Sequence, residues 1–451
     1  MIRQTIAAGA LLIAASPAAA QSQQEALDAR YDRALAAGYK ALFLCSAIAN
    51  ADRVGQDRMP EHVEKWELTG IQAPLDEIIH TLPHEIITGP NGVVDHVTVT
   101  WADDMPPRVA RYRGRAGCAI MPLGTVPETG GHAYAKYGDA VIRNWHKRVD
   151  TPVRSRLEAA FGDEYGEGSR TTSVIVDRGG QVVDEMSAEG FGPFVPQRTW
   201  SVAKSIAATL VGMAVQRGEA DVNASAGLGA GEGDPRAAIT IDHLLRMASG
   251  RYSDTAGNRT DPIYFGGATV NERAANWPLI HAPGTAYRYA NNDTLMAIAA
   301  IKGSLADTSV TEQLWNAGMT NTTAEADWQG NFILSSQVWA SPFDLVELGR
   351  LYLNDGMRGD VRILPEGWAE YVSAPSGPQP EGSAFGYGAG FWLFNNSPGV
   401  PADTYAAMGN RGQYVVIIPS RDVVIVRRGE DPVGSRFDIA AFTRDVLAEL
   451  D

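Results

Sequence analysis

The chain is poor in cysteine, with only Cys45 and Cys118 among its 451 residues. Neither cysteine lies in a pattern typical of a catalytic thiol, so a cysteine-hydrolase interpretation has no support. In an exported protein we expect the two to form a disulfide that closes a loop in the N-terminal part of the chain. A pair of buried thiols is the alternative.

Positive charge and long hydrophobic runs are also scarce. The chain has 38 Lys and Arg against 53 Asp and Glu, for a formal net charge of −15. This balance argues against binding to nucleic acid or to anionic membrane surfaces. No uninterrupted apolar run after the N-terminal leader reaches the ~20 residues that span a bilayer. We therefore expect no nucleic-acid partner and no membrane span in the mature chain.

Several familiar catalytic motifs are missing. There is no Gly-x-Ser-x-Gly elbow, so an α/β-hydrolase triad is unsupported, and there is no P-loop or dinucleotide fingerprint. Three histidines, His80, His84 and His96, lie near one another in sequence. Their spacing matches no metal site, because a proline at position 83 breaks any helix between the first two. We expect neither a cofactor nor a metal ion.

The N-terminus has the features of a secretory leader. Arg3 provides one positive charge, residues 6–15 are apolar, and residues 18–20 form an Ala-x-Ala cleavage pattern. This order predicts a signal peptide, residues 1–20, cleaved after Ala20. The mature protein would then be secreted or periplasmic, with 431 residues (451 − 20) and, without Arg3, a charge of −16.

The mature chain divides into two parts. Residues 21–150 are an N-terminal accessory region, in which 24–50 predict a helix. Strand-like runs follow in the same region, and the last of them ends at Ile120. Residues 151–451 carry the motifs that suggest chemistry. The sequence does not indicate the role of the accessory region.

The central motif of the second part is a serine three residues before a lysine, Ser201 and Lys204, at the start of an apolar run over 206–215. The run predicts a helix, on which these two side chains share a face. Serine needs a neighbouring base to act as a nucleophile, and lysine can serve if burial lowers its pKa. A capping serine beside a solvated lysine is the alternative.

A second motif is Tyr289-Ala290-Asn291, on a loop before another apolar helix. A phenol held near an ammonium is expected to have a lowered pKa and to shuttle protons. The amide of Asn291 can hold both a lysine and a substrate carbonyl. A packing tyrosine and a capping asparagine are the alternative.

The strands of this region lie at its two ends. Residues 173–183 predict a hairpin with glycines in the turn, and 404–426 predict three further antiparallel strands before a closing helix over 437–450. This order predicts an α+β fold. One antiparallel sheet combines the first and last elements and is flanked by helices, and a helical lobe lies between.

These motifs, in this order, resemble the serine β-lactamase and penicillin-binding protein superfamily, in particular its class C-like branch. That branch also contains β-lactamase-like esterases and aminohexanoate-oligomer hydrolases. The resemblance covers residues 170–450 and implies a β-lactamase-like fold with an N-terminal extension. It implies an exported serine hydrolase that cleaves an amide or ester bond through an acyl-enzyme on Ser201.

The resemblance also implies roles for the motif residues. Lys204 and Tyr289 would act as acid and base, and Asn291 would orient Lys204 and the substrate. The backbone N–H groups of Ser201 and of a residue on the terminal edge strand would form the oxyanion hole, which stabilises developing negative charge.

The third motif departs from the family, in which it reads Lys-Thr-Gly. Matching its glycine to Gly409 assigns Ala407, Met408 and Gly409 to substrate binding and makes Asn410 the second oxyanion donor. This register resembles the aminohexanoate-hydrolase branch. Counting back from Gly412 would instead place the third motif at residues 404–406 and make Ala407 the second oxyanion donor. Neither register contains a lysine, so the cation that would hold a β-lactam or peptide carboxylate is missing.

Arg411 is a candidate replacement for that cation, and a solvated turn residue is the alternative. Without the lysine, we expect a small-molecule or short peptide-like substrate with an ester or amide bond. A β-lactamase or D-amino acid peptidase is the alternative enzyme, and a binding or sensor protein without turnover is the alternative of another class. The sequence does not indicate an oligomeric state.

Overall fold

The computed structural model describes residues 17–127, 151–231, 233–252, 260–305 and 310–451. Most of the predicted signal peptide lies outside the described residues, as does the predicted boundary at residue 150.

The main feature of the fold is a seven-stranded antiparallel sheet in the order β12-β13-β14-β15-β16-β5-β6. Its strands are β5 (Thr171–Arg178), β6 (Gln181–Ser187), β12 (Gly386–Tyr387), β13 (Trp392–Leu393), β14 (Tyr405–Gly409), β15 (Gln413–Ile418) and β16 (Val423–Gly429). The last strand in the sequence, β16, pairs with β5, the first strand of this sheet in sequence, and Val426 lies opposite Ile175. The predicted sheet of first and last elements is confirmed.

Both faces of this sheet are covered by helices. In β15, Val415 and Ile417 belong to the apolar core that includes α5 (Val202–Gln216) and α11 (Pro342–Leu353). Val416 and Ile418 belong to a second core, with α13 (Ile439–Leu450) and α4 (Arg154–Ala159). Successive side chains of a strand point to opposite faces of the sheet. The unbroken apolar run of β15 is therefore suited to a strand that lies between two helical layers. The α+β class is confirmed.

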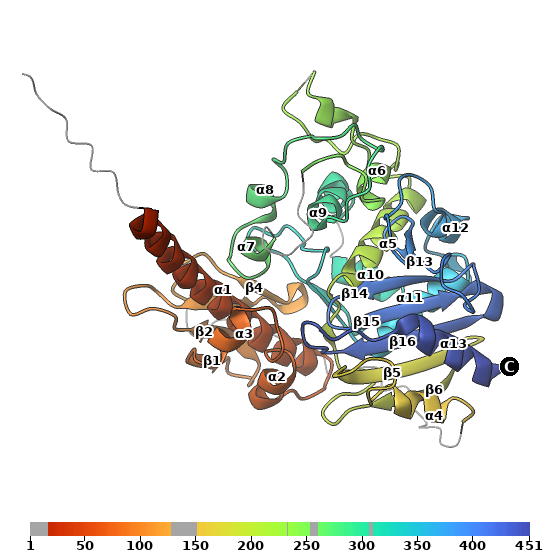
Figure 1. The fold of residues 1–451 in the computed structure, drawn as a ribbon, viewed down its shortest axis with the longest axis horizontal. Helices are drawn as coiled ribbons and strands as arrows, with labels where there is room; N and C mark the ends of the chain where they lie inside the picture. Colours follow the sequence, from red (N-terminus) through yellow and green to blue (C-terminus); the bar gives the residue numbers. More distant parts are fainter. Residues whose placement is uncertain (1–16, 128–150, 232, 253–259, 306–309) are drawn as a thin grey trace, which may run out of the picture.

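A helical lobe lies above the sheet in the view of Figure 1. Its elements are α6 (Ile241–Leu245), α7 (Asp261–Tyr264), α8 (Val270–Arg273), α9 (Asn291–Ala300), α10 (Val310–Asn316) and α12 (Trp368–Ser373). Thr240 caps α6, since its side chain accepts a hydrogen bond from the His243 backbone N–H. Two small sheets complete this part, β7-β9-β8 (Gln197–Arg198, Val338–Ala340, Thr323–Ala324) and β10-β11 (Met357–Arg358, Val361–Arg362).

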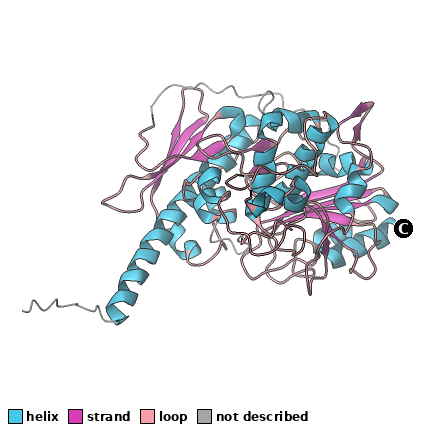
Figure 2. Cartoon of the chain, turned by 90° about the horizontal axis from the view of Figure 1, so that it is seen from above, coloured by secondary structure: helices cyan, strands magenta, loops and turns pink. Residues whose placement is uncertain are grey.

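The N-terminal region consists of a long helix, α1 (Pro17–Arg53), against a four-stranded antiparallel sheet, seen to one side of the molecule in Figure 2. The strands are β1 (His84–Thr88), β2 (Val94–Val99), β3 (Arg108–Tyr112) and β4 (Cys118–Ile120), and the short helices are α2 (Pro60–Trp66) and α3 (Leu75–Ile79). A disulfide between Cys45 and Cys118 joins α1 to β4. The predicted helix, strands and disulfide are confirmed.

Helix α1 also packs against the C-terminal part of the chain. Among the described residues it is the one helix long and apolar enough to cross a membrane, yet 94% of its most apolar window is buried inside the protein. Its Phe43 ring lies 6.0 Å from Trp200 and 5.8 Å from Trp339. A Cβ atom at Gly38 would lie 1.8 Å from the Phe265 carbonyl oxygen. α1 is therefore a core helix shared by both parts of the chain.

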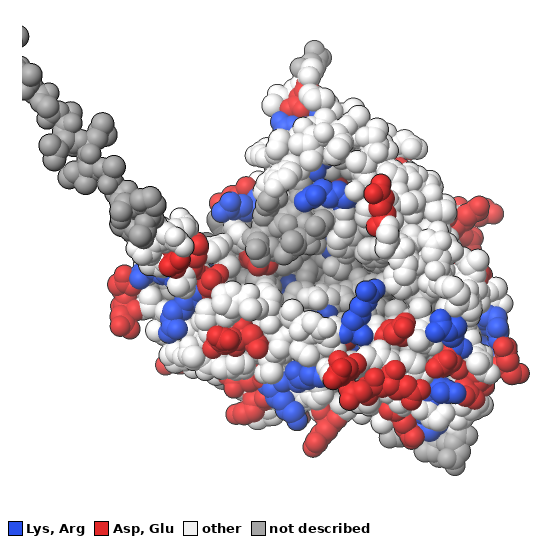
Figure 3. Space-filling model, viewed as in Figure 1, with Lys and Arg blue, Asp and Glu red and all other residues white. Residues whose placement is uncertain are grey.

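The charged surface is mixed in sign. On the face shown in Figure 3, acidic and basic side chains are interspersed, with acidic ones prominent along the lower edge. This distribution fits the net charge of −15 and gives no extended basic patch on the described surface of that face.

Candidate active site

The site begins where a short strand turns into helix α5. Trp200 has a backbone φ of +50°, a left-handed conformation that is uncommon for a bulky residue. The Arg198 guanidinium lies 4.1 Å from the Trp200 ring and donates to Ser336 Oγ at 2.9 Å. This turn brings Ser201 to the N-terminus of α5, where backbone N–H groups lack partners within the helix.

Lys204 lies one turn into α5, and its amine is surrounded by acceptors. Its Nζ lies 2.9 Å from Ser201 Oγ, 2.7 Å from Asn291 Oδ1 and 2.9 Å from the Ser335 carbonyl oxygen. The predicted contact between serine and lysine is therefore present. The third contact comes from a segment that no motif indicated.

Burial sets the protonation of this lysine. Only 2% of Lys204 is exposed, and desolvation lowers its pKa from 10.5 to about 7. Desolvation is the cause of this shift, and no carboxylate among the described residues contributes to it. A lysine with this pKa is largely neutral at slightly alkaline pH and can accept a proton.

Tyr289 completes the polar group beside Ser201, but its titration differs from the expectation. Its ring lies 4.9 Å from Lys204 Nζ. Burial raises the pKa of Tyr289 well above 10, and a hydrogen bond with Ser201 offsets this only in part. The predicted lowering of this pKa is wrong, because a desolvated phenolate is costly and the neighbouring lysine is itself readily neutral.

Asn291 is held on both sides of its amide. Its Oδ1 accepts from Lys204, and its Nδ2 donates to Thr260 Oγ1 at 2.9 Å. The second contact fixes which amide atom faces the lysine. The structure thus brings together Ser201, Lys204, Tyr289 and Asn291, the residues of the first two motifs.

The end of β14 approaches the start of α5. A Cβ at Gly409 would lie 2.5 Å from the Thr199 carbonyl oxygen and 3.0 Å from the Ser201 backbone nitrogen. Only glycine allows the two backbones to come this close. Met408, Gly409 and Asn410 line a cavity together with Ser201. The register that assigns the third motif to Gly409 is therefore the one that meets the serine.

Two residues assigned to substrate binding lie elsewhere. Ala407 is fully buried in the apolar core and does not line the cavity. Its position within β14 directs the side chain to the face that packs on α5. The Ala407 side chain therefore does not face this cavity, and the assignment of Ala407 to substrate binding stays a prediction.

Arg411 also points away from the cavity. Its Nε donates to Glu430 at 2.6 Å, and its Nη2 donates to the carbonyl oxygens of Trp66 and Thr69 at 2.9 and 2.8 Å. A buried carboxylate and two main-chain carbonyls hold this cation between the terminal hairpin and the N-terminal region. Arg411 is therefore neither a solvated turn residue nor the missing substrate cation.

The cavity beside Ser201 has a volume of about 770 Å³ and includes walls that the motifs did not reveal. Trp392 packs 5.4 Å from the Tyr289 ring, and Phe385 and Tyr414 add apolar surface. The charged residues in its lining are Arg436, Asp438 and Arg444. No pattern in the sequence marks these residues, because the turns and short strands that carry them are joined only by tertiary packing.

The described residues offer no metal centre. No group of three or more His, Cys, Asp or Glu among them could hold a metal ion. Of the three histidines considered from the sequence, His96 pairs with Asp95 at 2.6 Å and His84 lies 3.8 Å from Glu64. The polar atoms that surround Ser201 are an amine, an amide, a phenol and main-chain groups, which suit proton transfer and acyl chemistry.

Comparisons with known proteins find relatives of this chain. The 6-aminohexanoate-dimer hydrolase of Paenarthrobacter ureafaciens is 24% identical over 313 residues, which are 59% of this chain and 74% of that protein. The structure of "Putative 6-aminohexanoate-dimer hydrolase from Bacillus anthracis" is 19% identical with a TM-score of 0.53, and the match covers 62% of this chain and 79% of that one. EstCE1, a hydrolase with promiscuous acyltransferase activity, is 14% identical with a TM-score of 0.51, covering 66% and 97%.

At these identities the solved structures show a common fold and nothing finer. The family model for β-lactamase matches residues 159–447, which is more than half of the sequence. The matched range contains Ser201, Lys204, Tyr289, Asn291 and Gly409. The chain belongs to the β-lactamase family of serine hydrolases.

Proposed function

We propose that this protein hydrolyses an amide or ester bond through an acyl-enzyme formed on Ser201. The observation that carries the proposal is the 2.9 Å contact between Ser201 Oγ and the buried amine of Lys204, whose pKa lies at about 7. A neutral amine at this distance can take the hydroxyl proton as the oxygen attacks a carbonyl carbon.

Tyr289 is the proton donor of the proposed reaction. Its pKa stays high, so it keeps its proton at neutral pH and can give it to a leaving amine or alkoxide. Lys204 takes the proton of Ser201 and passes it to the Tyr289 oxygen, which restores the phenol and the neutral amine. Water then attacks the acyl-enzyme and releases the acyl group by the reverse proton transfers. Asn291, through its contact with Lys204, holds the amine in place.

The proposed oxyanion hole consists of the backbone N–H groups of Ser201 and Asn410. The close approach of Gly409 to Ser201 N supports this assignment, because it brings the end of β14 beside the serine. Two donors at this point would stabilise the negative charge that develops on the substrate oxygen.

The substrate we propose is a small molecule or short peptide-like compound with an unstrained amide or an ester. The third motif has no lysine. The arginines of the cavity lie outside that motif, Arg436 just before α13 and Arg444 in the middle of that helix. The relative named as 6-aminohexanoate-dimer hydrolase favours a linear amide. The apolar walls of the cavity beside Ser201, including Trp392 and Phe385, suit an apolar acyl chain.

Export of the protein is part of the proposal. The disulfide between Cys45 and Cys118 supports an oxidising compartment, and the leader over residues 1–20 supports secretion to the periplasm. We also propose that the hydrolase domain spans 151–451 and that 21–150 form an N-terminal accessory region.

The test is labelling of the purified mature protein with a fluorophosphonate, with Ser201→Ala as the matched control. Mass spectrometry should find one adduct on Ser201 in the wild type and none in the variant. The same samples are assayed with p-nitrophenyl esters, a linear amide and a chromogenic cephalosporin. Turnover of ester or amide that disappears in Ser201→Ala supports the proposal.

Other outcomes point elsewhere. Cephalosporin turnover at a comparable rate would make the protein a β-lactamase. An adduct without turnover of any substrate would favour a binding or sensor protein. Equal labelling of wild type and Ser201→Ala would refute the nucleophile.

A further inference from the structure

One acceptor of the Lys204 amine comes from the turn over residues 333–337. The Ser335 carbonyl oxygen lies 2.9 Å from Lys204 Nζ, and the Ser335 hydroxyl lies 2.6 Å from the Tyr264 hydroxyl. A neutral amine has two N–H groups and one lone pair. If Asn291 Oδ1 and Ser335 O accept the two N–H groups, the lone pair faces Ser201 Oγ. The position of Ser335 therefore directs the base toward the serine.

The base of this turn is the main chain of Glu325. The Glu325 N–H donates to the Gln337 carbonyl at 2.9 Å, and the Ile333 N–H donates to the Glu325 carbonyl at 3.0 Å. Inside the turn, the Gln337 N–H donates to the Ile333 carbonyl at 2.8 Å. These bonds connect the Glu325 main chain to residues 333 and 337, which lie on either side of Ser335.

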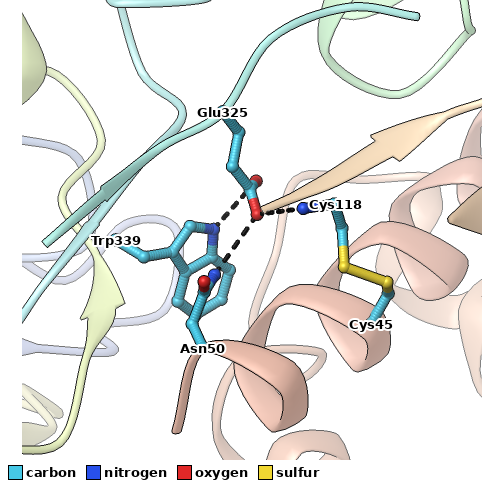
Figure 4. The surroundings of a disulfide bond; sticks show 5 residues. All are labelled: Cys45, Asn50, Cys118, Glu325 and Trp339. Carbon is cyan, nitrogen blue, oxygen red and sulfur yellow. Dashed lines mark hydrogen bonds between the residues drawn. A yellow bond between two sulfur atoms is a disulfide. The ribbon is translucent and has the colours of Figure 1, made fainter. Parts of the chain in front are cut away.

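The side chain of Glu325 is held by the N-terminal region and by β9. It is fully buried, and its carboxylate accepts from Cys118 N at 2.9 Å, Asn50 Nδ2 at 3.3 Å and Trp339 Nε1 at 3.1 Å (Figure 4). These three partners are donors, and the Ser46 hydroxyl is a further hydrogen-bond partner. Burial raises the pKa of Glu325 to about 7, and these donors together with Arg198 offset the rise only in part. The donors favour the ionised carboxylate. The Cys45–Cys118 disulfide fixes β4 to α1, and these two elements supply two of the donors.

We propose that Glu325 is a positioning residue for Lys204, clamping the 333–337 turn against the disulfide-linked N-terminal region so that the Ser335 carbonyl aims the amine. This inference rests on the proposed roles of Ser201 and Lys204. It gives the N-terminal region a function in catalysis, because the region supplies Asn50 and Cys118 to the clamp. Trp339 extends the clamp to β9, which pairs with β7 just before Ser201.

The test compares Glu325→Gln with Asp177→Asn in the full chain. The glutamine keeps one carbonyl oxygen but turns an N–H₂ group toward a donor. Asp177 of β5 is a matched control, because it is a buried carboxylate that forms an ion pair with Arg350 of α11. Its described ion pair lies outside the 333–337 turn. Asp177→Asn should lower thermal stability only.

For Glu325→Gln we expect kcat to fall about 10- to 100-fold with KM little changed. The acid limb of the kcat/KM profile should shift to lower pH, because the lysine ammonium loses an acceptor while Tyr289 stays protonated. Hydrogen exchange should become faster in peptides covering 333–337. Replacing both cysteines by alanine should also move the acid limb of the kcat/KM profile to lower pH and make hydrogen exchange over 333–337 faster. Both effects should be smaller than in Glu325→Gln.

The clamp is refuted if folded Glu325→Gln keeps the wild-type pH profile of kcat/KM and the wild-type hydrogen exchange over 333–337. It is also refuted if Asp177→Asn shows the same changes as Glu325→Gln. If Glu325→Gln does not fold, Glu325→Asp keeps the charge, and its shorter side chain should give a smaller shift of the same sign. A wild-type protein that a fluorophosphonate does not label would contradict the proposed function. Hydrogen exchange over 333–337 would still decide the clamp, because it needs no activity.

Discussion

At the scale of single residues, burial shifts the pKa of both titrating groups beside Ser201, Lys204 and Tyr289. Burial disfavours the charged form of any side chain. It therefore lowers the pKa of Lys204 to about 7 and raises the pKa of Tyr289. In the proposed mechanism the lysine is then a base available near neutral pH, and the tyrosine is a donor that keeps its proton. The two motifs receive complementary roles from the same desolvation.

The first prediction concerns the pH dependence of the wild type. Since the neutral amine is the active form, kcat/KM with a p-nitrophenyl ester should rise about tenfold per pH unit on the acid side and level off above about pH 7. Lys204→Arg keeps the cation but cannot lose its proton, and should lower kcat about 10²- to 10⁴-fold. A flat profile across this range would contradict the assignment of Lys204 as the base.

The second prediction separates proton donation from attack. Tyr289→Phe removes the donor but keeps the ring that packs against Trp392. An amide leaving group must be protonated, whereas p-nitrophenolate need not be. The loss should therefore be about 10²- to 10⁴-fold for a linear amide and much smaller for the nitrophenyl ester. Equal losses for both substrates would count against Tyr289 as the donor.

At the scale of elements, the site depends on how closely β14 approaches the start of α5. The Gly409 backbone lies against Thr199 and Ser201 because no side chain separates them. This contact connects the central sheet to the nucleophile's helix and supports the proposed oxyanion donor at Asn410.

The third prediction tests that contact. Gly409→Ala would put a methyl group 2.5 Å from the Thr199 carbonyl oxygen and 3.0 Å from Ser201 N, so the strand end must move. We expect kcat to fall by about 10²-fold or more, with a smaller loss of stability. Gly303→Ala is the control, since a Cβ there meets no atom within 4 Å. Wild-type turnover in Gly409→Ala would argue against this oxyanion arrangement.

At the scale of the whole molecule, the N-terminal region and the hydrolase part share one apolar core. Helix α1 is long and apolar, but its surface is covered by its own sheet on one side and by the elements around Trp200 and Phe265 on the other. Arg411 adds a polar connection between the terminal hairpin and the carbonyls of residues 66 and 69.

The fourth prediction follows from this shared core. Gly38→Ala would bring a Cβ to 1.8 Å from the Phe265 carbonyl oxygen, which belongs to the backbone and cannot move alone. We expect a loss of about 1–3 kcal/mol in the free energy of unfolding, measured by denaturant titration. Both parts should still unfold in one transition. Two separate transitions in the wild type would show that the parts do not share a core.

The elements near the ends of the hydrolase region were predictable because their signals are local. Alternating and continuous apolar runs identified β5, β6, β15 and β16, and helical spacing identified α1, α5 and α13. The residues of the first two motifs, Ser201, Lys204, Tyr289 and Asn291, were also identified, since their patterns are short and occur in a characteristic order. The short strands β12 and β13 were missed, because two-residue strands have no periodicity to detect.

The sequence by itself determined the candidate nucleophile, its lysine and the order of the strands, because each is written in neighbouring residues. Only the tertiary structure decided which groups touch them. It buried Lys204 and so set its pKa, and it placed Arg411 in a buried ion pair. It also brought the Ser335 carbonyl to the amine and the Glu325 carboxylate to Cys118. Burial and long-range contacts depend on segments far apart in the chain, so no local pattern contains them.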